Sequence, residues 1–199
     1  MKAYIKKNST DRYLYPIRKQ IIELINPDSS VYDFGCGNGD LLFKLSAKIR
    51  KGIGFDNSKS LISYANKRKS LEQINNIDFK LVNLTKDSLT NNPVNYSVAS
   101  LFFHVLYKKD ALRLLQKMID ISEVTIVCGF SKPKTCKQNF LLHLDQRFSS
   151  HYPNFTNYKE NNYMKGILDS IKNIDIECYS TFDPVIKIYR ITKHTKKFT

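Results

Sequence analysis

The residues with the clearest chemical signal stand in the stretch VYDFGCGNGDLL, residues 31–42, which packs three glycines into five positions between two apolar runs. Because glycine has no side chain, it lets the backbone turn sharply and approach a ligand closely. A glycine turn between the first strand and first helix of an α/β sheet lies at the carboxyl edge, where such folds bind ligands. We therefore expect Gly35, Gly37 and Gly39 to hold a nucleotide-like cofactor.

The spacing of these glycines distinguishes between classes of cofactor. The dinucleotide fingerprint is G-x-G-x-x-G, whereas here the third glycine comes one residue early and Asp40 follows it. A pyrophosphate at that helix start would meet the Asp40 carboxylate, and no Gly-Lys-Ser/Thr of a P-loop follows. A phosphate-free ligand, an adenosine joined to an amino acid, fits better. Asp33 is then placed to meet the ammonium group. Asp56, at the exposed end of the second strand, can accept hydrogen bonds from both ribose hydroxyls.

Strands and amphipathic helices alternate along the chain and position these residues. Helices are predicted at residues 12–25, 39–50, 58–69, 109–121 and 163–171, with Pro16 in the first turn of the first helix and Ser58 capping the third. Strands are predicted at residues 30–34, 51–56, 77–84, 96–103, 123–130, 175–181 and 185–192. The last two form an antiparallel hairpin. The pattern indicates one α/β domain, residues 1–199, built on a doubly wound, mostly parallel sheet.

Four segments resemble the successive motifs of the class I S-adenosylmethionine-dependent methyltransferases: VYDFGCGNGDLLFKLS, GIGFDNSKSLISYA, DFKLVNL and ASLFFHVL. The resemblance extends over nearly the whole chain. It implies a Rossmann-like, seven-stranded sheet of order 3-2-1-4-5-7-6, with helices on both faces and the last strand antiparallel. It also implies S-adenosylmethionine as the cofactor and methyl transfer as the activity.

The same resemblance implies roles for individual positions. The positions matched to cofactor binding are Asp33, Gly35, Gly37, Asn38, Gly39, Asp56, Asn57, Asn83, Leu84 and Phe102. Asn83 stands where the family often has Asp and is expected to pair with the exocyclic amine of adenine. Phe103 and His104 follow at the end of the fourth strand, beside the reactive methyl group, and are expected to contact the acceptor. No catalytic residue is assigned, although His104 is a candidate general base.

Residues 131–161, after the fifth strand, are predicted to be an irregular insertion or lid, because they are too long for a plain connection. They start from the carboxyl edge of the sheet, so they can fold back over the exit of the fourth strand. Arg147, His151 and Tyr152 are therefore expected to contact the methyl acceptor. Arg147 can grip a carboxylate or phosphate in bidentate fashion. The alternative is an ordinary helical insertion that packs on the sheet edge.

Composition bears on the acceptor. The chain has 32 basic and 18 acidic residues, a net charge of +14, which makes a nucleic-acid partner possible. The basic residues are scattered, however, and the Asn-Pro-Pro-Tyr motif of nucleic-acid amino methyltransferases is absent from the exit of the fourth strand. We therefore favour a small-molecule acceptor with an oxygen or nitrogen nucleophile. The alternatives are an RNA or protein methyltransferase and a module that binds the cofactor without catalysis.

The cysteines and the apolar runs bear on metal binding and location. Cys36, Cys128, Cys136 and Cys178 form no CxxC pair, so no zinc site is predicted. Free thiols suit a reducing compartment. No apolar run approaches the roughly 20 residues needed to cross a bilayer. We expect a cytoplasmic protein; the pattern carries no signal for its oligomeric state.

Overall fold

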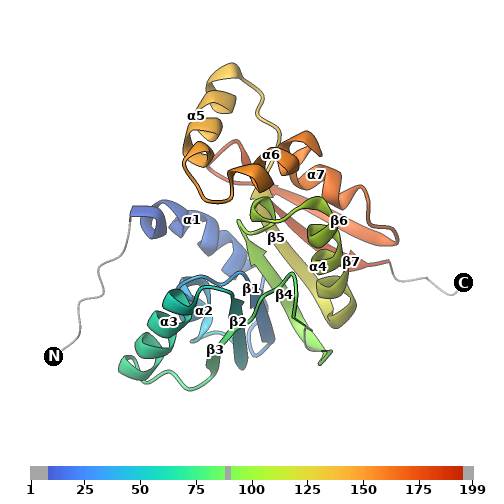
Figure 1. Cartoon of the computed structure of the whole chain (residues 1–199). Coiled ribbons are helices and arrows are strands. Elements are labelled where there is room, and N and C mark those ends of the chain that lie inside the picture. Colours follow the sequence, from blue (N-terminus) through green and yellow to red (C-terminus); the bar gives the residue numbers. More distant parts are fainter. Residues whose placement is uncertain (1–8, 88–90, 195–199) are drawn as a thin grey trace, which may run out of the picture. The chain divides into compact units, whose positions relative to one another are not determined.

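The computed structural model describes residues 9–87 and 91–194, with side chains from Arg12 onward (Figure 1). Its seven strands form a sheet in the order β3-β2-β1-β4-β5-β7-β6, which confirms the predicted fold class. The chain divides into two compact units, residues 1–98 and 99–199. Each unit is described in turn, and the assignment of residues 1–199 to a single domain stays a prediction.

The first unit contains α1 (Ser9–Glu23), β1 (Ser30–Phe34), α2 (Asp40–Leu45), β2 (Lys51–Asp56), α3 (Lys59–Leu71), β3 (Ile77–Leu81) and most of β4 (Val94–Ser100). Its strands are all parallel: β1 pairs with β2 and β4, and β2 pairs with β3. Asp33 stands opposite Gly54, and Phe34 stacks on Phe55 with ring centroids 5.3 Å apart. This register brings the carboxyl ends of β1 and β2 level with each other.

Two local predictions in this unit have different outcomes. Ser58 caps α3 as expected, because its side chain accepts the backbone N–H of Leu61. The placement of Pro16 in the first turn of α1 is wrong: the helix begins at Ser9 and Pro16 lies inside it. The polar residues before Arg12 extend the helix toward the N-terminus. The buried face of α1 still follows the predicted spacing, through Ile17, Ile21 and Ile25.

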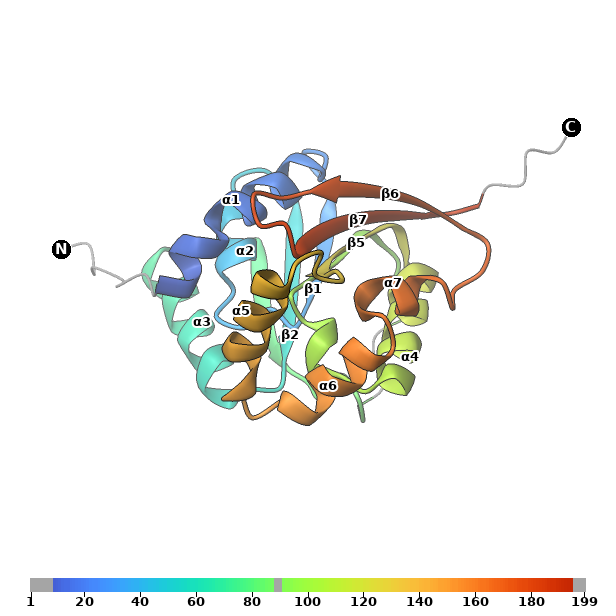
Figure 2. The ribbon, with the colours of Figure 1, turned by 90° about the horizontal axis from the view of Figure 1, so that it is seen from above.

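The second unit contains the end of β4, the 3₁₀ turn η1 (Phe103–Val105), α4 (Lys108–Ile121), β5 (Ser122–Phe130), α5 (Cys136–Arg147), α6 (Tyr152–Glu160), α7 (Tyr163–Leu168), β6 (Ile174–Ser180) and β7 (Ile186–Lys193). β7 runs antiparallel to both β5 and β6, as predicted, and the three strands lie side by side in Figure 2. The core of this unit is the near-continuous apolar stretch of β5 packed beside β7.

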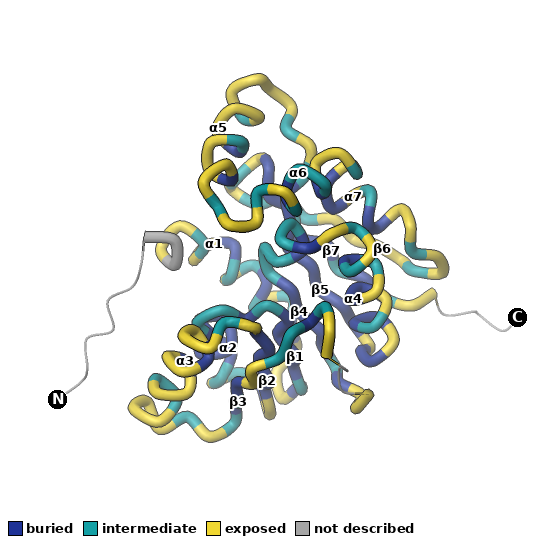
Figure 3. The backbone as a smooth tube through the Cα atoms, in the orientation of Figure 1, coloured by how far each residue is buried: buried dark blue, intermediate teal, exposed yellow. Residues whose placement is uncertain are grey.

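The structure corrects two predictions in the second unit. Residues 131–161 are not irregular throughout, since they contain α5 and α6, as in the alternative of a helical insertion. Thr135 and Gln138 make a reciprocal capping box that starts α5, and Figure 3 shows this helix largely exposed. The fourth strand ends at Ser100 rather than at residue 103. Leu101 breaks it with a left-handed φ of 51°, so Phe102 and Phe103 lie in the turn that follows.

No helix among the described residues is both long enough and apolar enough to cross a membrane.

Candidate active site

The glycine loop joins β1 to α2 in the first unit. Gly35, Gly37 and Gly39 all have left-handed φ angles, of 76°, 54° and 77°, which side chains rarely allow. A Cβ on Gly39 would lie 2.4 Å from the Phe79 ring, so this glycine serves packing. A Cβ on Gly37 would meet no atom within 4 Å. The loop therefore has an open side at Gly37, where a ligand can approach the backbone.

Asp56 ends β2 and holds the loop from the neighbouring strand. Its Oδ2 accepts the backbone N–H of Gly37 over 2.9 Å, and its Oδ1 accepts that of Ser58 over 2.8 Å. The expectation that Asp56 lies exposed is wrong, because its residue exposure is 9%. Each carboxylate oxygen can accept more than one hydrogen bond, so Asp56 can hold the loop and still accept ribose hydroxyls.

Asp33 lies in β1 beneath the loop and is 2% exposed. Burial raises the pKa of Asp33 to about 7, because desolvation disfavours the carboxylate; the charge of Arg18 opposes this rise and that of Asp56 adds to it. At neutral pH the side chain is therefore near its titration midpoint. A cationic ammonium brought close to Asp33 would favour the ionised form, which is the role expected for this residue.

The acid after the third glycine lies in a cluster of charges. Asp40 accepts a hydrogen bond from Arg18 over 2.6 Å and another from Lys44, and Arg68 lies 3.6 Å from its Oδ1. Burial alone would raise the pKa of Asp40, but Lys44, Arg18 and Arg68 together lower it. The sequence suggested that a bare Asp40 carboxylate would repel a phosphate. The structure corrects this, because three cations offset the negative charge of Asp40.

The remaining positions matched to the cofactor differ in how they are held. Asn38 Oδ1 accepts the backbone N–H of Asp40 over 3.2 Å at the start of α2, and Asn57 is exposed. Asn83 Oδ1 accepts both the N–H and the hydroxyl of Thr85, at 3.0 and 2.8 Å. An adenine amine would have to donate to the same oxygen, which already accepts two hydrogen bonds. The adenine contact of Asn83 therefore stays a prediction. Leu84, the next residue, is buried.

In the second unit, helix α6 packs against the exit of β4. Asn154 Nδ2 donates to the carbonyl of Val105 over 2.6 Å, and Asn157 Oδ1 accepts the N–H of Lys108 over 3.1 Å. Phe103 is fully buried, whereas Phe102 is partly exposed. The cofactor contact of Phe102 and the acceptor contact of Phe103 stay predictions.

His104, the candidate base, lies in an aromatic setting. Its ring meets Phe130 edge-on at 5.0 Å and Tyr158 at 6.5 Å. Its Nδ1 is buried and has no hydrogen-bond partner among the described residues. Burial, with a smaller contribution from His151, lowers the pKa of His104 to about 4. The imidazole is therefore neutral at physiological pH and a weak proton acceptor.

The other predicted acceptor contacts lie at the junction of α5 and α6. Arg147 is exposed, and within the described part of the chain it pairs with no acid. Tyr152 contacts His143, with the phenol oxygen 3.5 Å from Nδ1 and the rings edge-on. His151 is exposed beside Tyr152. The described residues contain no group of His, Cys, Asp and Glu that could hold a metal ion.

Sequence reasoning missed the residues that line a cavity of about 500 Å³ in the second unit, among them Lys132, Lys159 and Tyr163. A usable signal was present. The pair Asn161-Asn162 precedes Tyr163. Next to glycine, asparagine is the residue that best tolerates a left-handed backbone, so the pair indicates a turn at this point.

Comparisons with known proteins identify the family and the fold. Residues 25–179 match the model of a family described as a methyltransferase domain. The candidate methyltransferase 235L of Invertebrate iridescent virus 6 is 30% identical over 49% of this chain, and the match spans 34% of that protein's length.

Solved structures share the fold. A SAM-dependent methyltransferase from Aquifex aeolicus has a TM-score of 0.65 at 16% identity, with 92% of this chain and 93% of that one covered. The magnesium protoporphyrin IX methyltransferase of Synechocystis PCC 6803, solved with bound S-adenosylhomocysteine, has a TM-score of 0.63 at 15% identity, with 96% and 90% covered.

The seven-stranded fold and the matched family model together define the class of this protein. The chain belongs to the class I S-adenosylmethionine-dependent methyltransferase family.

Proposed function

We propose that this chain transfers the methyl group of S-adenosylmethionine to an oxygen or nitrogen atom of a small molecule. S-adenosylmethionine supplies a methyl group already activated on a sulfonium, so the protein's task is to align the acceptor and exclude water. The proposal rests on the family and on two regions of the chain, which are taken separately below.

The first unit supports the cofactor assignment. The backbone at Gly37 has an open side, and Asp56 is fixed beside it by two backbone hydrogen bonds. In this proposal Asp56 holds the ribose hydroxyls, Asp33 meets the ammonium group, and the loop lies along the amino-acid portion. The bound S-adenosylhomocysteine of the Synechocystis relative is consistent with this use of the fold.

The single observation that carries the choice of a small molecule is the cavity in the second unit. Its volume of about 500 Å³ falls within the range of small-molecule sites, about 300–1,000 Å³. Five of its seven lining residues fall in residues 131–161, the segment predicted to contact the acceptor, although Arg147, His151 and Tyr152 are not among them. The net charge of +14 favours the alternative, an RNA acceptor.

A methyl-labelling assay separates the two acceptors. Purified protein and S-adenosylmethionine labelled in the methyl group are incubated with a small-molecule extract of cells and, in parallel, with total RNA. We expect label in the small-molecule fraction. Label only in RNA would replace this proposal with the RNA alternative. Calorimetric binding of S-adenosylhomocysteine without label in either fraction or in added protein would favour a non-catalytic module.

A further inference from the structure

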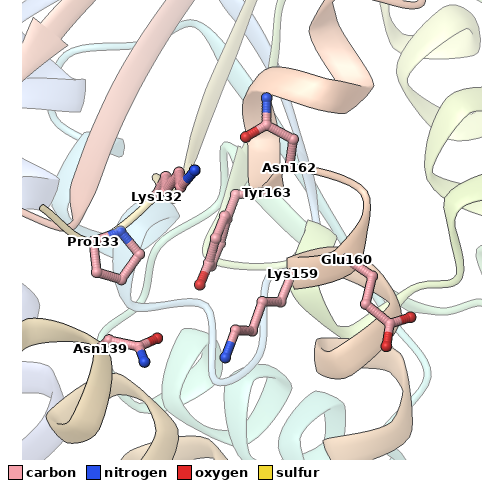
Figure 4. A pocket seen from close by; sticks show the side chains of 7 residues that line it. All are labelled: Lys132, Pro133, Asn139, Lys159, Glu160, Asn162 and Tyr163. Atoms are coloured by element: carbon pink, nitrogen blue, oxygen red, sulfur yellow. The ribbon is translucent and has the colours of Figure 1, made fainter. Parts of the chain in front are cut away.

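Three separate parts of the chain, all within the second unit, line the cavity. Lys132 and Pro133 follow β5, Asn139 belongs to α5, and the remaining lining residues come from the end of α6 and the start of α7: Lys159, Glu160, Asn162 and Tyr163. Figure 4 shows these side chains around one space. The cavity is therefore a property of this unit alone.

The charge around this space is mainly positive. Lys132 and Lys159 are exposed, and neither ammonium pairs with a carboxylate within the part of the chain that the structure describes. Glu160 is the acid in the lining, and in Figure 4 its carboxylate points away from Tyr163 and from Lys132. Lys132 and Lys159 both line this space, and the surplus of positive charge that they bring to it favours an anion there.

Tyr163 supplies a polar group from the buried side. The residue is 4% exposed, and its ring packs edge-on against Tyr158 at 5.8 Å. Its hydroxyl points into the cavity toward Asn139 and Lys159 in Figure 4. Burial raises the pKa of Tyr163, so the phenol stays protonated and able to donate a hydrogen bond.

The backbone that presents Tyr163 is strained. Asn162 and Tyr163 both have left-handed φ angles, of 63° and 57°. A Cβ on Gly166 would lie 1.8 Å from the carbonyl oxygen of Asn161, so only glycine fits in the next turn. Left-handed backbone at a non-glycine residue costs about 1–2 kcal/mol and is concentrated at ligand sites. This turn fixes the point from which the Tyr163 side chain leaves the backbone.

We infer that this cavity binds an anionic group, a carboxylate or a phosphate, carried by a small-molecule acceptor. Lys132 and Lys159 provide the charges, and the Tyr163 hydroxyl and the Asn139 amide provide directed hydrogen bonds. This inference rests on the proposed function, because it names the chemical class of the acceptor. A space of about 500 Å³ suits a small molecule that carries an anionic group better than a polynucleotide backbone.

The test uses the full chain, ¹⁵N-labelled and observed by NMR while inorganic phosphate and, separately, malonate are added. Saturable shifts are expected at residues 132–163. The double variant Lys132→Ser/Lys159→Ser should weaken binding at least tenfold, which is the scale of one charged hydrogen bond. The matched control is Lys137→Ser/Lys172→Ser, which removes the same charge from exposed residues outside the lining, and it should bind within twofold of the parent. Tyr163→Phe, which keeps the packed ring, should weaken binding about threefold.

Three outcomes would overturn the inference: no saturable binding of either anion, equal weakening in both double variants, or binding of a short RNA through Lys132 and Lys159 without binding of phosphate or malonate. S-adenosylhomocysteine affinity is measured on the same samples. If that ligand binds and the anions do not, the cavity inference fails while the proposed function stands. If S-adenosylhomocysteine does not bind, the proposed function itself fails.

Discussion

The glycine loop of the first unit and the strand exit of the second unit satisfy their polar groups in different ways. In the loop, both oxygens of Asp56 and the side-chain oxygen of Asn38 accept backbone N–H groups. In the second unit, His104 Nδ1 and Ser149 Oγ are buried without a hydrogen-bond partner among the described residues. Local backbone bonds thus engage the side-chain oxygens of the loop, whereas these two atoms of the second unit keep their hydrogen-bonding capacity.

The largest expected effect concerns Asp33, the buried carboxyl group beneath the glycine loop of the first unit. Its pKa is raised from 3.8 to about 7 in the folded state, so the folded protein holds a proton that the unfolded chain has lost. Stability should therefore fall as pH rises from about 4 to about 7, by up to about 4 kcal/mol. Asp33→Asn should flatten that decline, as measured by urea unfolding across the range. Parallel pH profiles in both proteins would show that Asp33 is not buried and protonated.

The second prediction separates the two roles of glycine in the loop. Gly39→Ala places a methyl group against Phe79 at a left-handed φ and should cost about 3 kcal/mol of unfolding free energy. Gly37→Ala meets open space, so it should cost about 1 kcal/mol. The smaller change should nevertheless weaken S-adenosylhomocysteine binding, measured by calorimetry. Equal stability losses in the two variants would remove this distinction.

The third prediction tests Asp56 as the link between loop and ribose. Asp56→Ala removes the acceptor for two backbone N–H groups, so stability should fall by about 1–3 kcal/mol and S-adenosylhomocysteine affinity by a similar free energy. Asp78→Ala is the control, because Asp78 of β3 pairs with Lys69 of α3 and holds no part of the loop. Unchanged affinity in a folded Asp56→Ala protein would exclude Asp56 from the site.

The smallest expected effect on cofactor binding belongs to Arg147. Arg147→Ala should lower methyl transfer about tenfold, the scale of one charged hydrogen bond, and leave S-adenosylhomocysteine affinity within error. Arg113→Ala, a change to an exposed arginine of α4, should alter neither. Equal activity of the two variants would mean that Arg147 does not contact the acceptor.

Local patterns in the sequence predicted much of the fold. The bounds of β1 and β2 agree with the structure, because each is a short apolar run bounded by a turn and a charge. The α5 helix was missed, although Thr135 and Gln138 carry a capping-box signature that predicts it. The early end of β4 depends on the left-handed backbone of Leu101, a residue type that rarely adopts it, so no local pattern could indicate it.

The parts of the candidate site that come from short local motifs were predictable. The parts that bring together residues far apart in the sequence were not. Asp33, the glycines and Asp56 follow from the edges of two adjacent strands. The neutralisation of Asp40 depends on Arg18 and Arg68, which reach it from two separate helices. The cavity likewise depends on how α5 and α6 fold back, which brings Lys132 and Tyr163 together across about thirty residues.

The Asp40 cluster has a consequence for how this sequence can vary. Arg18, Lys44 and Arg68 share one buried carboxylate, and Arg68 also lies over the Phe43 ring with its guanidinium carbon 3.9 Å from the centroid. Loss of Asp40 alone would leave three cations facing one another, whereas loss of one cation leaves two partners behind. Homologues should therefore exchange single basic positions freely, and should replace the acid only together with at least two of its partners.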